Sequence, residues 1–276
     1  MKRCILLFAV MAGLAIVYNS YVLSDNETRV LRVGVECDHA PYNWEEDNPS
    51  DTNFPLKNKP GFYAEGYDVQ MAALVAENIG AKVEFIKVSW DMLIKTLQRR
   101  EIDAIFSGMV DTDERKHLIA FSIPYEVKKV EYAVLINRKS KYIDAKNLND
   151  MAGARMIAQT DSRFDEVIDQ IPNVVHLPPL DTQKAIIDEV VNFKADGTVL
   201  DYDTGHSYAS MYNKNLDVIR FSAGDGFALG FTGLCAGFRK ADAKLLKKVN
   251  KAIESVPPRE RQKIMDKVIF KEWENF

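Results

Sequence analysis

Predicted strands and helices alternate through the first part of the chain, and this order limits the fold more than any other feature. Residues 30–35 and 82–88 are rich in β-branched residues, as strands are, and residues 102–106 form a short apolar strand. Residues 66–80 and 90–99 instead place apolar side chains at helical spacing. Strand–helix–strand–helix–strand predicts a mostly parallel sheet with helices on both faces.

A second run of the same kind follows Arg138. Its predicted strands cover residues 155–159, 174–177, 198–200 and 216–221, and its helices cover 148–151, 162–171 and 182–193. A strand over 234–238 and two C-terminal helices complete the chain. Because 276 residues suffice for two domains, each with its own core, we predict two α/β units. Residues 38–65 follow neither period and predict a long loop.

The first residues have the composition of an export signal. Lys2 and Arg3 precede an apolar run that is short for a membrane span. No small-x-small cleavage triplet follows this run, so residues 1–24 predict either a signal peptide or an uncleaved N-terminal anchor. Both alternatives predict an exported protein, periplasmic or extracytoplasmic.

Export would permit a disulfide between Cys37 and Cys235, although two buried free thiols are favoured. The sequence has no Cys/His spacing typical of zinc sites and no glycine-rich phosphate loop, so we expect neither a metal nor a cofactor. The net charge of −4 gives no reason to expect nucleic acid or an anionic membrane as partner.

The segment 103–125 contains the first candidate binding group. A short strand breaks at Ser107-Gly108, and Asp111 with Glu114 has the spacing of a capping box. Arg115 then falls in the first turn of a helix. A guanidinium beside unpaired backbone N–H groups suits a carboxylate or a phosphate. The alternative is that Arg115 is a solvated surface arginine.

Polar residues follow the strands of both units. Glu36, Trp90 and Gly108 lie at the carboxyl ends of three strands, where ligands bind in open α/β sheets. In the second unit Ser162 begins a helix, and Asp201 ends a strand. Asp201 suits either an ion pair with a ligand opposite Arg115 or the N-cap of the next segment. The first alternative predicts that a small zwitterion is held at both poles.

Four stretches carry a resemblance to a known family: LRVGVECDHAPYNW, the run GYDVQMAALVAENIGAKVEFIKVSWDMLIKTLQRREIDAIFSGMVDTDER, FSIPY and DGTVLD. Over roughly residues 29–273 the chain resembles the amino-acid-binding proteins of ABC importers, the family 3 extracellular solute-binding proteins. The resemblance implies a two-lobed periplasmic-binding-protein fold that closes around its ligand. Lobe I would comprise 29–126 and 234–276, lobe II 131–224, and the hinge 127–130 and 225–233.

The resemblance also implies roles for particular residues. Arg115 would hold the α-carboxylate, helped by backbone N–H groups at Val110 and Arg163, and Asp201 would hold the α-ammonium. Trp90 and His39 would flank the side chain of the ligand, and Glu36 falls where relatives carry an Asp that reads its far end. The predicted ligand-binding residues are Glu36, His39, Trp90, Ser107, Gly108, Val110, Arg115, Gln159, Ser162, Arg163 and Asp201.

Three departures from the family pattern affect the ligand. Val110 replaces the usual Ser or Thr, Arg163 occupies a turn that is usually small, and the loop 43–61 is long enough to cover the cleft mouth. Glu36 favours a cationic or amide side chain. An inward Arg163 would favour a polar or anionic one, or would neutralise Glu36. We expect a polar or cationic amino acid.

The implied function is the substrate-binding component of an ABC importer, a monomer that hands an L-amino acid to a membrane permease. Two alternatives remain. A cyclohexadienyl-dehydratase-like enzyme would need a catalytic acid, and the sequence offers none beyond Glu36, so no enzyme is expected. A ligand-sensing module would instead report to a membrane receptor.

Overall fold

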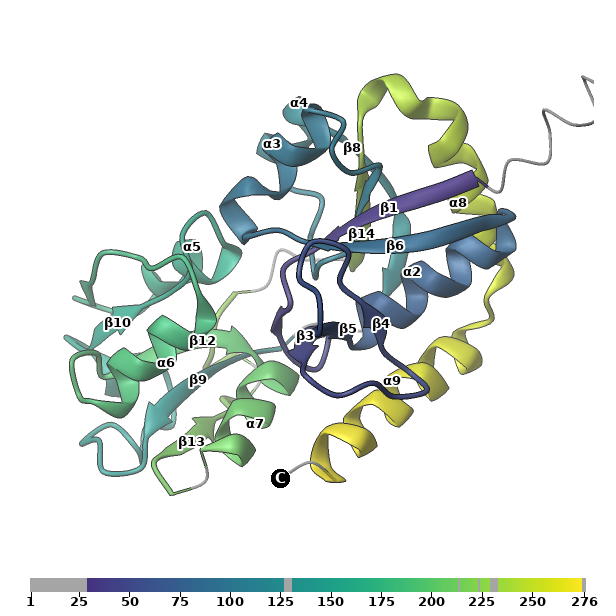
Figure 1. The fold of residues 1–276 in the computed structure, drawn as a ribbon. Helices are drawn as coiled ribbons and strands as arrows, with labels where there is room; N and C mark the ends of the chain where they lie inside the picture. Colours follow the sequence, from purple (N-terminus) through teal and green to yellow (C-terminus); the bar gives the residue numbers. More distant parts are fainter. Residues whose placement is uncertain (1–28, 127–130, 213, 223, 229–232, 275–276) are drawn as a thin grey trace, which may run out of the picture.

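The computed structural model describes residues 29–274 except 127–130, 213, 223 and 229–232. Two α/β lobes lie side by side, each built around its own five-stranded sheet (Figure 1). The predicted leader, the segment 127–130 and part of the second hinge segment lie outside the described residues. No helix in the described part of the chain is long and apolar enough to cross a membrane.

Lobe I contains the sheet with strand order β6-β1-β7-β14-β8. Its strands are β1 (Arg29–Val35), β6 (Ala81–Lys87), β7 (Ala104–Ile105), β8 (Ala120–Glu126) and β14 (Leu234–Phe238). The central strand β1 pairs in parallel with β6 and β7, and β14 runs antiparallel to its neighbours β7 and β8. The chain therefore returns to lobe I through β14 after it has formed lobe II.

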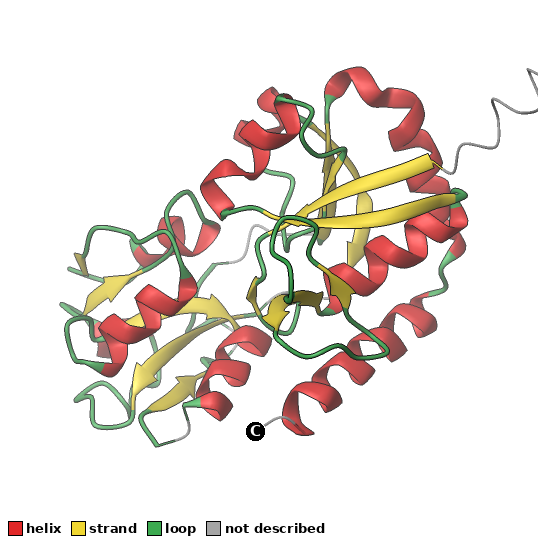
Figure 2. Ribbon diagram, in the orientation of Figure 1, coloured by secondary structure: helices red, strands yellow, loops and turns green. Residues whose placement is uncertain are grey.

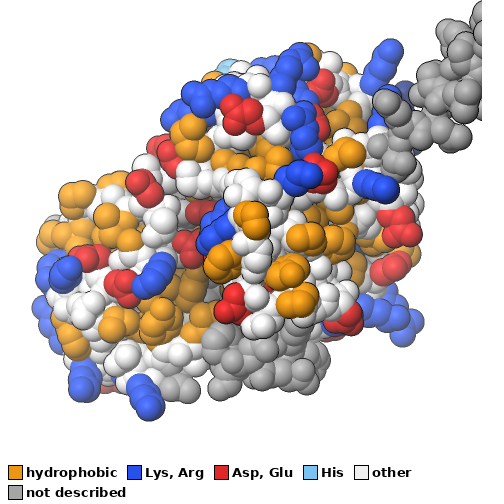
Figure 3. All heavy atoms as spheres, in the orientation of Figure 1, with side chains coloured by type: hydrophobic (Ala, Val, Ile, Leu, Met, Phe, Trp, Pro, Cys, Tyr) orange, Lys and Arg blue, Asp and Glu red, His pale blue; other side chains and the backbone are white. Residues whose placement is uncertain are grey.

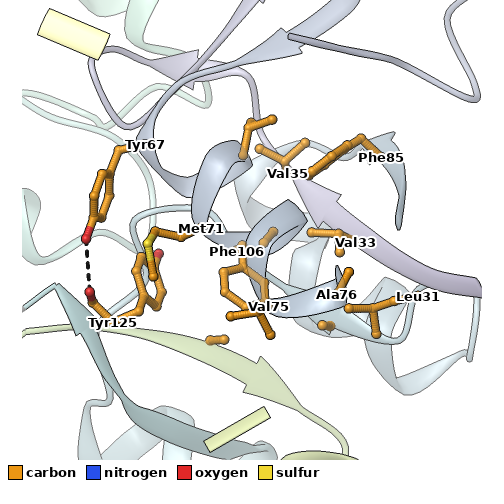
Figure 4. Packing of buried hydrophobic residues seen from close by; sticks show 14 of the residues in the cluster. Leu31, Val33, Val35, Tyr67, Met71, Val75, Ala76, Phe85, Phe106 and Tyr125 are labelled. Carbon is orange, nitrogen blue, oxygen red and sulfur yellow. Dashed lines mark hydrogen bonds between the residues drawn. The ribbon is translucent and has the colours of Figure 1, made fainter. Parts of the chain in front are cut away.

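Helices cover both faces of this sheet (Figure 2). One face packs on α2 (Tyr67–Asn78), α8 (Ala243–Ser255) and α9 (Pro258–Glu274), because Leu31, Val33 and Val35 alternate along β1 toward it. Figure 4 shows this core, in which the Tyr67 hydroxyl donates to the Tyr125 carbonyl over 3.0 Å. The opposite face packs on η1 (Trp90–Met92) and α3 (Leu93–Gln98), with α4 (Asp113–Leu118) following β7.

Lobe II has the strand order β11-β10-β12-β9-β13. The strands are β9 (Tyr132–Asn137), β10 (Arg155–Ile157), β11 (Val175–His176), β12 (Gly197–Asp201) and β13 (Leu216–Ile219). One face packs on η2 (Leu148–Met151) and α5 (Arg163–Ile168), and the other on α6 (Gln183–Val191) and α7 (Tyr202–Met211). The predicted two-lobed α/β architecture is confirmed.

Both sheets are mixed, whereas the sequence predicted mostly parallel ones. In lobe II β10 pairs in parallel with β11 and β12, but β9 is antiparallel to β12 and β13. The strands that run against the parallel direction are those next to the two crossings between the lobes: β9 follows the first crossing, and β14 follows the second. Their direction is set by the side from which the chain enters each lobe, and not by a strand–helix–strand unit of that lobe.

Residues 38–65 form a small sheet, and their prediction as a loop was wrong. The strands β2 (Asp38–His39), β3 (Asn43–Glu46), β4 (Phe54–Pro55) and β5 (Tyr63–Glu65) pair in the order β2-β3-β5-β4. Strands of two to four residues are too short to show a periodic pattern. The ion pair of Glu45 with Lys87 attaches this sheet to β6, and its pair with Lys59 lies within the segment.

Two local predictions have clear outcomes. The N-cap of α4 is Thr112, whose Oγ1 accepts from the Arg115 backbone N–H over 3.2 Å; the prediction of Asp111 was wrong by one residue. Cys37 and Cys235 are both buried free thiols, as favoured. In addition, Gly66 is the N-cap of α2 and has φ 122°. A Cβ there would lie 2.3 Å from the Tyr42 carbonyl oxygen, so only glycine fits.

Candidate functional site: a cavity between the lobes

A cavity lies between the two lobes and is lined by both. Lobe I contributes residues from the small sheet, from η1, from the loop after β7, from α4 and from the start of β14. Lobe II contributes the start of β9, the loop after β10, the start of α5 and the end of β12. The lining residues are His39, Tyr42, Trp90, Gly108, Val110, Arg115, Tyr132, Gln159, Ser162, Arg163, Phe164, Asp201 and Leu234.

Arg115 supplies a buried cation from lobe I. Its Nη1 donates to the Val110 carbonyl over 3.2 Å, and its Nη2 donates to the Asp161 carbonyl of lobe II over 2.9 Å. The guanidinium carbon lies 5.1 Å from the centre of the Trp90 ring. Burial lowers the pKa of Arg115, so an anion in the cavity would stabilise its charged form.

Asp201 supplies a buried carboxylate from lobe II, and its predicted role as an N-cap is confirmed. Its Oδ1 accepts from the Thr204 backbone N–H over 3.0 Å, which makes Asp201 the N-cap of α7. Its Oδ2 lies 3.1 Å from the Nε2 atom of His39 in lobe I. The bond from Oδ1 to the backbone of α7 fixes the direction of the Asp201 side chain, so Oδ2 points toward lobe I.

His39 is surrounded by carboxylates. Burial lowers the pKa of its imidazole, but the hydrogen bond to Asp201 and the charges of Asp201, Glu36 and Asp68 raise the pKa more, and the net shift is upward. A protonated His39 therefore forms an ion pair with Asp201 across the two lobes.

Glu36 is buried behind the cavity. Its backbone N–H donates to Ser107 Oγ over 2.9 Å, and its carboxylate accepts from Gln159 Nε2 of lobe II. Gln159 Nε2 also donates to the Asp181 carbonyl, and its Oε1 accepts from Gln183 Nε2 over 3.1 Å. Burial raises the pKa of Glu36 to about 7, against the opposing charge of His39.

A further contact between the lobes lies at Asp38. Its Oδ2 accepts from the Gln183 backbone N–H in the first turn of α6 over 2.9 Å. The Tyr208 hydroxyl donates to the Asp38 carbonyl, also over 2.9 Å. Together with the contacts of His39, Glu36 and Arg115, these bonds hold the lobes closed over the cavity.

The start of α5 forms the lobe II wall. Ser162 Oγ accepts from the Asp165 backbone N–H over 3.3 Å, which confirms the predicted cap. The next residue, Arg163, pairs with Glu166 over 2.9 Å. The helix ends at Ile168, three residues before the predicted end at Ile171.

We expect Ser162→Ala to lower the free energy of unfolding by about 1 kcal/mol, because an orphan N–H of α5 loses its acceptor. Urea unfolding followed by circular dichroism measures this loss. Asn147→Ala, which removes the cap of η2 away from the cavity, is the control for a general loss of a cap. An unfolding midpoint equal to that of the unmodified protein would contradict the predicted role of Ser162.

Most predicted site residues line this cavity. The lining includes His39, Trp90, Gly108, Val110, Arg115, Gln159, Ser162, Arg163 and Asp201. Within the described residues, Glu36 and Ser107 are buried but not part of the lining. The sequence reasoning missed Tyr42, Tyr132, Phe164 and Leu234. Tyr132 and Leu234 begin the strands that follow the two crossings, and their position next to the crossings was the available signal.

Two α/β lobes that close on a cavity containing a buried guanidinium and a buried carboxylate define a two-lobed ligand-binding protein. The family model described as "Bacterial extracellular solute-binding proteins, family 3" matches residues 31–271, and the chain belongs to this family. The resemblance noted in the sequence is therefore confirmed.

Individual relatives agree with this assignment. The chain is 26% identical to a probable histidine-binding protein of Campylobacter jejuni over 75% of this chain and 73% of the relative. It is 30% identical to the ABC transporter arginine-binding protein 1 of Escherichia coli over 69% of this chain and 75% of the relative. Both relatives are named as binding proteins.

Solved structures share the fold. One is an amino acid ABC transporter substrate-binding protein from Streptococcus pneumoniae bound to L-arginine. It superposes with a TM-score of 0.73 at 24% identity, over 87% of this chain and 94% of that one. This likeness confirms the periplasmic-binding-protein architecture.

Proposed function

We propose that this protein is the extracytoplasmic binding component of an ABC amino-acid importer, which captures a free L-amino acid between its lobes. The observation that carries the proposal is the presence of Arg115 from lobe I and Asp201 from lobe II in one cavity. A free amino acid carries both a carboxylate and an ammonium, so one cation and one anion on opposite walls match its two poles. The partner would be a membrane permease, and the leader would export or tether the protein.

The α-carboxylate of the ligand would bind Arg115. This assignment is supported by the planar guanidinium, which can bind two carboxylate oxygens, and by the low exposure of its site. Backbone N–H groups at Val110 and Arg163 would add donors to the carboxylate. These donors matter more here because Val110 has no hydroxyl group. The α-ammonium would bind Asp201, with the carbonyl near Gly108 assisting.

The ligand side chain would pack among the aromatic residues Tyr42, Trp90, Tyr132 and Phe164. Aromatic faces attract cations, which agrees with the arginine and histidine in the names of the two relatives. The carboxylate of Glu36 accepts from Gln159, and Gln159 rather than Glu36 lines the cavity. We therefore assign the contact with the side chain of the ligand to Gln159. A polar or cationic amino acid is the ligand class that these features favour.

An enzymatic function is not favoured, because the named relatives are binding proteins. The structure offers no new argument for the sensing alternative. A pull-down from membranes with the full chain separates the two partners: an ABC permease agrees with the importer proposal, and a receptor agrees with sensing.

Calorimetry against the twenty amino acids, on protein refolded to remove carried-over ligand, tests the proposal. We expect one-site binding of at least one polar or cationic amino acid. Asp201→Asn should weaken it about tenfold to more than a hundredfold, because a charge-assisted contact of about 1.5–3 kcal/mol is lost. Asp196→Asn, which removes an ion pair with Arg155 in lobe II, is the matched control. Failure of all twenty to bind would overturn the proposal.

A further inference from the structure

One contact in the cavity joins a group of lobe I directly to the proposed ammonium-binding carboxylate. The Nε2 atom of His39 lies 3.1 Å from Asp201 Oδ2, and both side chains are nearly buried. The other oxygen of Asp201 already accepts from the backbone of α7. The imidazole therefore bonds to the one carboxylate oxygen that does not serve as a helix cap.

The ring of His39 is held in this place by the protein. Its centre lies 5.3 Å from the ring of Tyr42 and 6.0 Å from that of Phe164, both in edge-on geometry. Gly108, at φ 62°, lies next to Nδ1 of His39, and a Cβ on Gly108 would lie 3.1 Å from that nitrogen. The absence of a side chain at Gly108 thus leaves room for the imidazole.

The charges around His39 favour the imidazolium. Carboxylates face it from the end of β12, from the residue after β1 and from α2 (Asp201, Glu36 and Asp68), and they raise its pKa although burial lowers it. The cations of Arg115 and Arg163 line the same cavity. The ring is therefore positioned like a ligand ammonium, and its raised pKa favours the charged form.

We propose that His39 is an internal competitor for the ammonium site, which holds Asp201 and the two lobes together until an amino acid displaces it. This inference rests on the proposed function, because it assigns the ligand ammonium to Asp201. It gives His39 a role in setting affinity, beyond that of an aromatic wall for the ligand side chain.

Competition makes binding depend on pH. An ammonium and an imidazolium beside one carboxylate repel each other, so binding of the amino acid releases the proton of His39 to solvent. Affinity should then rise with pH through the titration of His39, by at most about tenfold per pH unit for one proton. The closed form also lowers the fraction of molecules that can admit a ligand, which weakens apparent affinity further.

Two substitutions separate charge from contact. His39→Gln keeps an N–H donor close to the position of Nε2 but never carries a charge, and His39→Phe keeps the ring packing without a hydrogen bond. His176→Gln removes a histidine that pairs with Asp165 and Asp169 outside the cavity, and is the matched control. Because burial raises the pKa of Glu36 to about 7, Glu36→Gln tests whether that carboxylate causes the pH dependence.

Calorimetry at pH 6, 7 and 8 with the amino acid that binds is the first measurement. We expect affinity to rise with pH in the unmodified protein, His176→Gln and Glu36→Gln, and to be flat in His39→Gln and His39→Phe. At pH 6, His39→Phe should bind about three- to tenfold more tightly than the unmodified protein, since the competitor is gone. A flat profile in the unmodified protein, or a rising one in His39→Phe, overturns the proposal.

Small-angle scattering without ligand is the second measurement, with thermal unfolding to verify that each variant is folded. His39→Phe should have a larger radius of gyration than the unmodified protein at pH 6, because the bond between the lobes is lost. Equal radii overturn the proposal. This comparison needs no ligand, so it tests the His39 contact even where the amino-acid proposal fails in the calorimetric screen.

Discussion

Replacing Arg115 with methionine is expected to weaken amino-acid binding about tenfold to more than a hundredfold, because a charge-assisted contact of about 1.5–3 kcal/mol to the ligand carboxylate is lost. Methionine keeps an unbranched apolar stem next to Trp90 but offers no N–H donor. The Val110 and Asp161 carbonyls lose their donor as well, and the second of these contacts joins the lobes. The change should therefore weaken both ligand binding and lobe closure.

Isothermal titration calorimetry with the ligand from the amino-acid screen measures the effect. Arg155→Met is the control, since Arg155 is an ion-paired arginine of lobe II outside the cavity and its loss leaves the ligand contacts in place. Arg115→Lys should give an intermediate affinity, because an ammonium keeps the charge without the planar pair of donors. Wild-type affinity in Arg115→Met would contradict the assignment of the carboxylate site.

Local signals made some elements predictable from sequence. The helix α2 was expected over residues 66–80 and is observed at Tyr67–Asn78. Its apolar spacing and its flanking glycines are signals that lie within the segment itself. The short helix η2 was expected and observed over 148–151. The cap at Ser162 was found for the same reason: its partner is three residues away.

The small sheet and the closing contacts could not be predicted in this way. Strands β2 and β4 have two residues each, and their pairing partners decide their conformation more than their own sequence does. Asp201 showed two alternative roles in the sequence, and only coordinates reveal that one oxygen caps α7 while the other meets His39. His39 and Asp201 are 162 residues apart, so nothing local to either indicates that they bond.

The charge of Glu36 depends on a competition that sequence alone does not reveal. The predicted role was a carboxylate facing the ligand, whereas the observed group is 4% exposed and accepts from Gln159 of the other lobe. Its pKa of about 7 is above the ordinary value of 4.5, because burial disfavours the charged form more than His39 favours it. A carboxylate in this position opposes folding once it ionises.

Glu36→Gln is therefore expected to stabilise the protein at pH 8 by up to about 3 kcal/mol, the free energy that corresponds to raising the pKa of Glu36 from 4.5 to about 7. The amide keeps an acceptor for Gln159 and carries no charge. Well below pH 4.5 Glu36 is protonated in both the folded protein and the unfolded chain, so its raised pKa costs no stability. As pH rises toward 7 the unfolded chain releases the proton first, so the stability of the unmodified protein falls.

Urea unfolding of both proteins between pH 4.5 and 8 measures this difference, which should grow with pH and level off above 7. Subtracting the two profiles removes the contribution of Asp68, whose pKa of about 6 is also raised by burial. Glu45→Gln is the control with the opposite sign: burial raises the pKa of Glu45, but its bonds to Lys59 and Lys87 lower it more, so its charge stabilises the fold above pH 4.5. A difference for Glu36→Gln that stays constant with pH would show that Glu36 is ionised in the folded protein as readily as in the unfolded chain, and that the contact with Gln159 compensates for its burial.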